Sequence, residues 1–292
     1  METIAAGNAE AVEAWNGVLF DRFLEYRHIF TAGLGTHGDA AMAIHPPPAG
    51  GSVLDIGCGF GDTTQQLAQL IGAEGDALGI DAAPRFIELA EREAEEAGAA
   101  NVRFMVCDPE AAAIEGSFDY AFSRMGTMFF ANPVAALRNI AGGMAPGGQL
   151  NMVVWRRKLE NEWAFRAEQV VEGFLEHTDP DDTDEPTCGP GPFSMANADT
   201  VSMQLRAGGF EEIDFRRSDL PMVYGRDVDE AVAVAMSLGP AGEIIRLAGE
   251  RGEETRPAIV DALRELMGEY AGDDGAVRIE ASCWIVSARV GG

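Results

Sequence analysis

Three glycines that alternate with other residues follow directly on an apolar run that contains an acid. Residues 53–61 read Val-Leu-Asp-Ile-Gly-Cys-Gly-Phe-Gly, so the acid is Asp55 and the glycines are Gly57, Gly59 and Gly61. Glycine permits positive φ angles and lets a ligand approach the main chain closely. Helical spacing resumes shortly after the last glycine, and a helix start presents unpaired N–H groups. The segment therefore predicts a strand, a tight ligand-binding turn and a helix, as in nucleotide-binding α/β folds.

The spacing of these glycines and the charges beside them restrict the ligand. A loop of the form G-x-G-x-x-G cradles a pyrophosphate, whereas here the third glycine comes one position early. Asp55 and Asp62 place two negative charges at the turn, which repel a phosphate but accept a cationic ligand that carries an amino group. The pattern disfavours a nicotinamide dinucleotide, although an NAD(P)-dependent oxidoreductase stays open as an alternative.

Two later apolar runs also end in an acid. Residues 77–81 end in Asp81, about 20 residues beyond the glycines, where an acid accepts hydrogen bonds from a ribose. Residues 102–108 end in Asp108. A single aspartate at a strand end is commonly a turn or helix-cap residue. Several of them at one edge of one sheet, however, predict a polar rim where a ligand binds.

Strand-like and helical runs alternate along the rest of the chain, with Asn132 and Pro133 as a helix cap and first-turn proline. This alternation predicts an α/β fold with a doubly wound, mostly parallel sheet. The four further strands are expected at 118–123, 149–155, 210–223 and 276–290.

Residues of about 50–155 resemble the core of the class I S-adenosylmethionine-dependent methyltransferases. The glycine turn resembles their first motif. The stretch 118–133, Phe-Asp-Tyr-Ala-Phe-Ser-Arg-Met-Gly-Thr-Met-Phe-Phe-Ala-Asn-Pro, and Met-Ala-Pro-Gly-Gly at 144–148 are similar to the bacterial small-molecule branch related to the ubiquinone and menaquinone methyltransferases. The resemblance implies a Rossmann-like methyltransferase fold with helical lid insertions, and S-adenosyl-L-methionine as cofactor.

The resemblance also implies which residues contact the cofactor. The glycine turn and its acid hold the methionine end, the acid after the second strand binds the ribose hydroxyls, and the acid after the third contacts the adenine amino group. The residues just after the fourth strand line the cofactor and face the substrate. The expected cofactor contacts are Asp55, Gly57, Cys58, Gly59, Gly61, Asp81, Ala82, Asp108 and Ser123.

The segments around this core have two interpretations each. Residues 1–49 include helical spacing over 10–30; they either pack on the sheet or form a lid, and Trp-Asn-Gly at 15–17 resembles an element of such lids. Residues 50–155 are the expected cofactor-binding core. Residues 156–292 complete the sheet within the same domain, with helical insertions that either cap the substrate or serve as packing or dimer surfaces.

A sulfonium methyl is already activated, so the protein mainly has to orient the acceptor behind it. Methionines and phenylalanines cluster after the fourth strand, which favours an apolar or aromatic acceptor but is also ordinary core composition. An oxygen acceptor needs a base; His28, His37 and Glu162 are weak candidates without diagnostic spacing. The expected substrate contacts are Trp15, Tyr26, Arg124, Met128, Trp155 and Arg156.

Composition narrows the class of protein. The chain has 292 residues, 47% hydrophobic residues and a net charge of −27, which repels nucleic acid and anionic membranes. No apolar run has membrane-spanning length and the first residues lack a basic region, so we expect a cytoplasmic protein. Cys58, Cys107, Cys188 and Cys283 form no C-x-x-C pair and no H-E-x-x-H occurs, so no metal is expected.

The sequence thus predicts methyl transfer from S-adenosylmethionine to a small, apolar or aromatic metabolite. A non-catalytic protein that binds S-adenosylmethionine or a partner is the alternative from another class. The sequence leaves the oligomeric state open, with a homodimer as one option.

Overall fold

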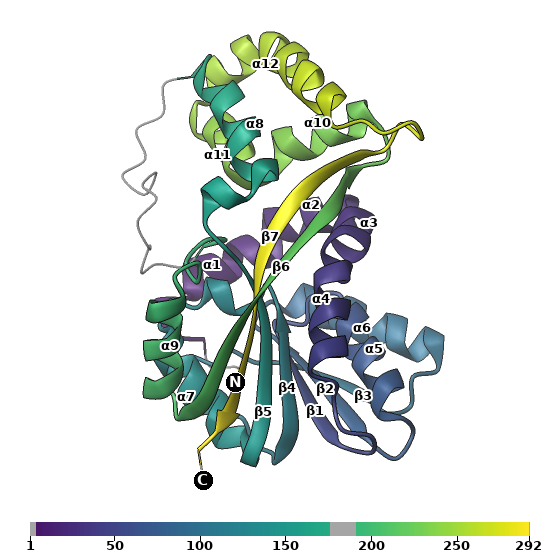
Figure 1. Ribbon diagram of the computed structural model, residues 1–292, viewed down its shortest axis with the longest axis vertical. Helices are drawn as coiled ribbons and strands as arrows, with labels where there is room; N and C mark the ends of the chain where they lie inside the picture. The colour runs from purple at the N-terminus through teal and green to yellow at the C-terminus, as the bar shows by residue number, and fades with distance from the viewer. Residues whose placement is uncertain (1–3, 176–190, 292) are drawn as a thin grey trace.

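The computed structural model describes residues 4–175 and 191–291. Its centre is a seven-stranded sheet in the order β3-β2-β1-β4-β5-β7-β6 (Figure 1). The first five strands of this order are parallel, while β7 runs antiparallel to both of its neighbours. The predicted doubly wound, mostly parallel sheet is therefore confirmed. The strands are β1 (Ser52–Ile56), β2 (Asp76–Asp81), β3 (Val102–Val106), β4 (Phe118–Arg124), β5 (Met144–Trp155), β6 (Phe210–Gly225) and β7 (Val277–Val290).

The helices that flank the sheet begin where local signals place them. Pro84 occupies the first turn of α6, and the Asn132 side chain accepts a hydrogen bond from the Ala135 N–H at the start of α7. Gly98 ends α6 in a left-handed conformation. The flanking helices are α4 (Gly35–Ile44), α5 (Asp62–Ile71), α6 (Pro84–Ala97), α7 (Pro133–Gly143) and α9 (Ala198–Ala207).

The N-terminal segment is more broken than its sequence spacing predicts. The chain runs through α1 (Ala9–Ala14), a π-helical turn (Trp15–Leu19), α2 (Phe20–Glu25), α3 (Arg27–Ile29) and a second π-helical turn (Phe30–Leu34). Gly17 is the reason for the first break, because its φ of −114° and ψ of −113° lie outside the helical region. The break lets Trp15 and Phe20 both pack against the core-facing Phe86.

Four helices gather beyond the carboxyl ends of the parallel strands, where β6 and β7 extend past the rest of the sheet (Figure 1). They are α8 (Glu162–Glu172), α10 (Val228–Ser237), α11 (Gly239–Leu247) and α12 (Glu250–Glu269). In Figure 1, α1–α3 lie between this group and the parallel strands. We call α8 and α10–α12 the helical group.

Helix α8 ends at Glu172, and His177 and Cys188 lie outside the described residues. Helix α12 contains Pro257 in its interior, where a proline normally weakens a helix. Burial of apolar side chains on the same helix outweighs the hydrogen bond that is lost at the proline. These buried residues are Ile259, Leu263, Leu266 and Met267. None of the described helices combines the length and the apolar character that a membrane span requires.

Candidate active site

One cavity of about 680 Å³ opens at the carboxyl edge of the parallel strands, and its volume is typical of small-molecule sites. Its walls come from the ends of β1, β2, β4 and β5, the N-terminal helices and the helical group. A larger hollow of about 880 Å³ lies along the edge strand β3 and α6. That hollow contains no residue of the glycine turn, so we place the functional site in the first cavity.

The glycine turn has the left-handed backbone that its composition predicts. Gly57, Gly59 and Gly61 have φ angles of 66°, 53° and 78°. A Cβ on Gly57 would lie 2.9 Å from the Cα of Gly126, so this position also requires glycine for close backbone contact with the β4 loop. A Cβ on Gly61 would lie 2.7 Å from the Phe104 ring, behind the cavity wall. Gly57 and Gly59 line the cavity, whereas Gly61 positions α5 behind them.

Asp81 ties the glycine turn to the end of β2. Its carboxylate accepts hydrogen bonds from the Gly59 N–H at 3.0 Å and the Ala83 N–H at 2.9 Å. Burial raises the pKa of Asp81, and the two N–H donors counteract that effect. Each carboxylate oxygen can accept a second hydrogen bond. Because Asp81 lines the cavity, this remaining capacity faces a ligand.

Asp55 and Ser123 support the turn from behind rather than lining the cavity. Asp55 accepts a hydrogen bond from the Thr64 hydroxyl at 2.6 Å, and burial raises its pKa to about 6. The Ser123 hydroxyl donates to the Ile56 carbonyl at 2.8 Å and so links β4 to β1. The expected cofactor contacts that do line the cavity are Gly57, Cys58, Gly59, Asp81, Ala82 and Asp108.

Asp108 joins the N-terminal segment to the rim. Its carboxylate accepts hydrogen bonds from the Ala5 N–H and from the Glu110 N–H, both at 2.9 Å. The side chain is buried and lies just past the end of β3. The chain before α1 therefore lies against the end of the cavity that Asp108 marks.

Four of the expected substrate contacts line the cavity, and two do not. Tyr26 is buried in the core next to the cavity wall, and Arg156 is held elsewhere. The four that line it are Trp15, Arg124, Met128 and Trp155.

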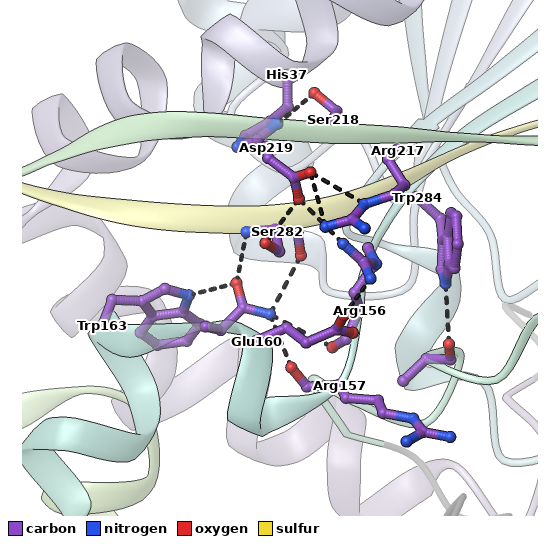
Figure 2. A network of polar contacts seen from close by, with 12 residues as sticks. His37, Arg156, Arg157, Glu160, Trp163, Arg217, Ser218, Asp219, Ser282 and Trp284 are labelled. Carbon is purple, nitrogen blue, oxygen red and sulfur yellow. Dashed lines mark hydrogen bonds and ion pairs between the residues drawn. The ribbon is translucent and has the colours of Figure 1, made fainter.

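Figure 2 shows the ion-pair network that holds Arg156 where the chain leaves β5. Its guanidinium donates to Asp219 at 3.0 Å and to Glu160, and it lies 4.8 Å from the centre of the Trp284 ring. Asp219 also accepts a hydrogen bond from the Ser282 hydroxyl at 2.8 Å. Arg156 thus fastens β5 to β6 and β7.

Asn161 extends the same network, because its side chain hydrogen-bonds to both Ser282 and Trp163. Its amide donates to the Ser282 carbonyl at 3.1 Å and accepts from the Ser282 N–H at 2.8 Å. The Trp163 indole N–H donates to the Asn161 side chain at 3.2 Å. Because Trp163 lines the cavity, the network fixes the orientation of one of its aromatic walls.

The three candidate bases lie away from the cavity. His28 is exposed and pairs with Glu230 at 3.0 Å, while Glu162 accepts a hydrogen bond from the Tyr270 hydroxyl at 3.0 Å. His37 is fully buried and contacts the Ser218 hydroxyl at 2.8 Å. Their catalytic role stays a sequence-based prediction, which none of these contacts supports.

Burial lowers the pKa of His37 to about 4, against a smaller opposing influence of Asp219. Below pH 6.5 the unfolded chain therefore binds a proton that the folded chain does not, so stability falls as the pH drops toward 4. Between pH 6.5 and 5, the free energy of unfolding of the His37→Gln variant should therefore fall by about 2 kcal/mol less than that of the wild type. Denaturant unfolding at each pH measures the difference. The raised pKa of Asp55 gives a slope of opposite sign that is common to both proteins. Equal slopes in both proteins would contradict the assignment to His37.

Sequence reasoning identified Trp155 as a cavity residue but missed three further aromatic residues that line the cavity with it. Trp163 lies 5.0 Å from Trp155, 6.2 Å from Phe193 and 6.5 Å from Tyr224, measured between ring centres. All four rings line the cavity, and we call them the aromatic wall. The rings come from β5, α8, the segment before α9, and β6, so no local pattern links them.

The cavity also has a charged pair that the sequence did not reveal. Lys158, the single lysine of the chain, lies 2.9 Å from Glu168, and both line the cavity. The signal available in the sequence was the isolated lysine directly after β5.

Comparison with known proteins shows which proteins are similar to this chain. A family model described as a methyltransferase domain matches residues 48–180. The aklanonic acid methyltransferase DauC of Streptomyces sp. (strain C5) is 37% identical over 114 residues, which is 39% of this chain and 52% of that protein. The demethylmenaquinone methyltransferase of Lactococcus lactis is 30% identical over 34% of this chain and 40% of its own length. Residues 48–180 therefore match a methyltransferase domain, and this part of the chain is similar to S-adenosylmethionine-dependent methyltransferases.

Other similarities extend over more of the chain. The nocamycin O-methyltransferase of Saccharothrix syringae is 30% identical over 186 residues, 60% of this chain and 65% of that protein. The matches span about half the length of the first curated relatives, or less. Among solved structures, YcgJ of Bacillus subtilis has a TM-score of 0.55 at 18% identity and covers 89% of this chain and 98% of its own. Haemonchus contortus phosphoethanolamine N-methyltransferase 2, crystallised with S-adenosyl-L-methionine, has a TM-score of 0.58 at 16% identity over 99% of this chain and 61% of its own.

The residues that line the cavity fit S-adenosylmethionine by their own chemistry. Gly57 and Gly59 give a ligand access to the main chain, and Asp81, which follows the turn by about 20 residues in the sequence, has free acceptor capacity in the cavity for a ribose. Asp62 lines the same cavity and supplies negative charge for a cationic ligand. These residues would hold the cofactor.

Proposed function

We propose that this methyltransferase transfers the methyl group of S-adenosylmethionine to a small aromatic or apolar acceptor. One observation carries the proposal. One cavity is lined both by the glycine turn with Asp81 and by the aromatic wall of Trp155, Trp163, Phe193 and Tyr224. A donor bound at the turn and an acceptor bound at the aromatic wall would share this cavity.

Orientation and exclusion of water are what the chain contributes to the reaction. The bound cofactor supplies an activated methyl group, so holding the acceptor in line can provide on the order of 7–11 kcal/mol of the barrier reduction. Trp15 and Phe129 pack edge to face, 4.9 Å apart between ring centres, and both line the cavity. These rings and the aromatic wall would keep water from the reacting atoms.

The chemistry of the wall and the relatives both support a small organic acceptor. Flat aromatic side chains stack on planar ligands and leave few polar groups unsatisfied. Two relatives are named for aklanonic acid and nocamycin, which are small molecules. The net charge of −27 opposes binding of nucleic acid or anionic membranes, and we also propose a cytoplasmic location.

Isothermal titration with S-adenosylhomocysteine, followed by methyl transfer from labelled S-adenosylmethionine to a panel of aromatic acceptors, tests the proposal. Binding together with turnover supports it. Binding without turnover across the panel would favour the non-catalytic alternative. Absence of binding to folded protein, with a nicotinamide absorbance change instead, would favour an oxidoreductase.

We further propose that residues 1–49 form a lid over the cofactor. Arg27 connects this segment to the core, because its guanidinium lies 2.7 Å from both Asp62 of α5 and Glu93 of α6. The ion pair with Arg27 lowers the pKa of Glu93. The segment also supplies Trp15 and Phe23 to the cavity wall.

Replacing Arg27 by glutamine should loosen this lid and speed release of S-adenosylhomocysteine about 3- to 10-fold, since partly exposed ion pairs contribute about 1 kcal/mol. Stopped-flow fluorescence of the cavity tryptophans measures the rate. Arg103→Gln is the control, because Arg103 pairs with Asp76 at 3.1 Å on the surface. Equal release rates in all three proteins would argue that the segment only packs on the sheet.

Tyr224 is the polar member of the aromatic wall. The residue is 3% exposed, and its hydroxyl hydrogen-bonds to no described residue. The hydroxyl oxygen itself is not completely enclosed by protein atoms. Burial raises its pKa, so the hydroxyl stays protonated as a donor. It is therefore available to an oxygen or nitrogen atom of the acceptor.

Tyr224→Phe should weaken the binding of an oxygen-bearing aromatic such as 1-naphthol about 3- to 10-fold, and leave that of naphthalene unchanged. Quenching of tryptophan fluorescence in the protein loaded with S-adenosylhomocysteine measures both. Tyr270→Phe is a matched control, since the Tyr270 hydroxyl donates to Glu162 outside the cavity. An equal loss for both ligands would show that Tyr224 acts through packing alone.

A further inference from the structure

We infer that Lys158 and Glu168 form the polar end of the acceptor site, where they bind an aromatic hydroxyl group and Glu168 takes its proton. The inference rests on the proposed function, because the hydroxyl oxygen is the atom that would receive the methyl group. Lys158 belongs to the short helical turn Lys158–Glu160 that follows β5, and Glu168 belongs to α8. Their charged groups lie 2.9 Å apart, and both residues line the cavity.

Glu168 lies on a face of α8 that is otherwise apolar. The buried residues of this helix are Ala164, Ala167, Glu168 and Val171, whose spacing forms a single stripe. The side chain of Glu168 is 9% exposed and that of Lys158 is 19% exposed. Removing two charges from water can cost more than their attraction returns, so a buried ion pair contributes little to stability. Its place on this stripe therefore points to a role in binding.

The other acids of the described cavity wall are engaged elsewhere. Three of them belong to the side that would hold the cofactor, at the start of α5 and the ends of β2 and β3: Asp62, Asp81 and Asp108. Glu243 is exposed and accepts a hydrogen bond from Arg246 at 2.7 Å. The three candidate bases from the sequence lie away from the cavity. Glu168 is therefore the buried carboxylate of the wall that is available to an acceptor.

The connection from the glycine turn to the pair runs across β4 and β5. A Cβ on Gly57 would lie 2.9 Å from the Cα of Gly126 in the β4 loop. Two residues later, the Met128 sulfur accepts a hydrogen bond from the Trp155 N–H at 3.3 Å, and Lys158 follows Trp155 by three positions. Strands lie about 4.8 Å apart, so the ends of β1 and β5, with β4 between them, are about 10 Å apart. A donor at the turn and an acceptor at the pair can meet between these ends.

Asn161 holds both members of the pair in place. Its N–H donates to the Lys158 carbonyl at 2.9 Å, and its own carbonyl accepts from the Ala164 N–H at 2.9 Å in the first turn of α8. Its buried side chain is bonded to Ser282 of β7. The turn that carries Lys158 and the helix that carries Glu168 are thus both fixed to the sheet.

A hydroxyl group matches this pair because it is both a donor and an acceptor. Its O–H can donate to the Glu168 carboxylate while its oxygen accepts from the Lys158 ammonium. In the transfer, Glu168 takes the proton and an oxygen electron pair forms the bond to the methyl carbon, while the electrons of the broken carbon–sulfur bond stay on sulfur. The carboxylate and the sulfonium both become neutral, and Lys158 keeps its proton.

Two ligands that differ by the hydroxyl alone test the binding step. 1-Naphthol and naphthalene are titrated into protein loaded with S-adenosylhomocysteine, and quenching of tryptophan fluorescence measures both. Wild type should bind 1-naphthol about 10- to 100-fold more tightly than naphthalene. Lys158→Met/Glu168→Met should lose most of that preference, keep its naphthalene affinity and unfold at the same or a higher denaturant concentration.

Arg166→Met/Glu269→Met is the matched control. Arg166 of α8 pairs with Glu269 at 3.2 Å, and neither residue is among those described in the cavity wall. This variant should bind both ligands like wild type. A wild type without preference for 1-naphthol contradicts the site. Equal losses for both ligands in the Lys158 and Glu168 double variant, together with easier unfolding, show instead that the pair acts through packing.

Glu168→Gln separates binding from proton transfer. The amide keeps an oxygen that accepts from the hydroxyl but cannot take its proton. The affinity for 1-naphthol should therefore fall only about 3- to 10-fold, while methyl transfer to phenols of the acceptor panel falls about 100- to 10,000-fold. Transfer of labelled methyl groups measures the rate, and an unchanged rate overturns the role of Glu168 as proton acceptor.

The same measurements distinguish failure of the site from failure of the proposed function. If wild type does not bind S-adenosylhomocysteine, the proposed function is overturned and the acceptor site with it. If wild type binds that ligand but methylates no member of the panel, the two naphthalene ligands still decide whether the pair recognises a hydroxyl. If the double variant does not fold, the wild-type preference and Glu168→Gln decide the result.

Discussion

Replacing Asp81 by alanine should weaken S-adenosylhomocysteine binding roughly 100-fold, which corresponds to about 3 kcal/mol for two hydrogen bonds to a charged acceptor. Asp81 lines the cavity, and its two backbone donors leave acceptor capacity for the ribose hydroxyls. Isothermal titration measures the change.

Two further variants separate the ligand contact from the structural role of Asp81. Asp76→Ala removes an acid from the other end of the same strand, where it pairs with Arg103 on the surface, and should not alter binding. Asp81→Asn keeps an acceptor oxygen for only one of the Gly59 and Ala83 N–H groups, which bond to different carboxylate oxygens, so it should lose affinity with a smaller loss of stability than Asp81→Ala. If all three variants bind like wild type, Asp81 does not contact the cofactor.

Gly57→Ala is expected to have the larger effect, with more than 100-fold loss of cofactor binding and about 2–4 kcal/mol loss of stability. A side chain at this position needs a φ of 66° and lies 2.9 Å from the Cα of Gly126, which is backbone and cannot rotate away. The turn must therefore move, and with it the backbone of Gly57 and Gly59 that lines the cavity.

Gly98→Ala is the matched control for this substitution. Gly98 has a φ of 67°, nearly that of Gly57, but a Cβ there meets no atom within 4 Å. It should lose only about 1 kcal/mol of stability through backbone strain and bind the cofactor normally. Denaturant unfolding and titration of both variants isolate the close approach at Gly57. Similar behaviour of the two variants would show that backbone strain alone matters.

The sheet and its polar rim were predictable because their signals are local. The glycine turn, the acids that follow β2 and β3, and the cap at Asn132 each specify a strand end or a helix start within a few residues. Parallel strands then bring those ends to one edge. The break at Gly17 was not predictable, since a single glycine is tolerated in many helices and here packing of Trp15 and Phe20 selects the kink.

The substrate side was harder to predict because it depends on which face of a strand each residue takes. Side chains alternate across a strand, so Trp155 lines the cavity while the next residue, Arg156, joins the network of β6 and β7. At the end of β4, Ser123 likewise bonds to Ile56 and Arg124 lines the cavity. The sequence identified these strand ends, but it did not show on which face of the sheet each side chain lies.

Tyr224 could not be found from sequence. It lies 61 positions from Trp163 and is brought to it only by the return of β6 to the helical group. Such a contact depends on tertiary packing, which no short-range pattern encodes.

The aromatic wall and the glycine turn come from separate stretches of the chain. The turn and rim lie within residues 52–126, while three of the four wall rings lie beyond residue 160. Mutations confined to the later stretch can therefore diversify acceptor preference without disturbing donor affinity. Directed evolution on this scaffold would do well to randomise Trp163, Phe193 and Tyr224 first, with the N-terminal half kept constant.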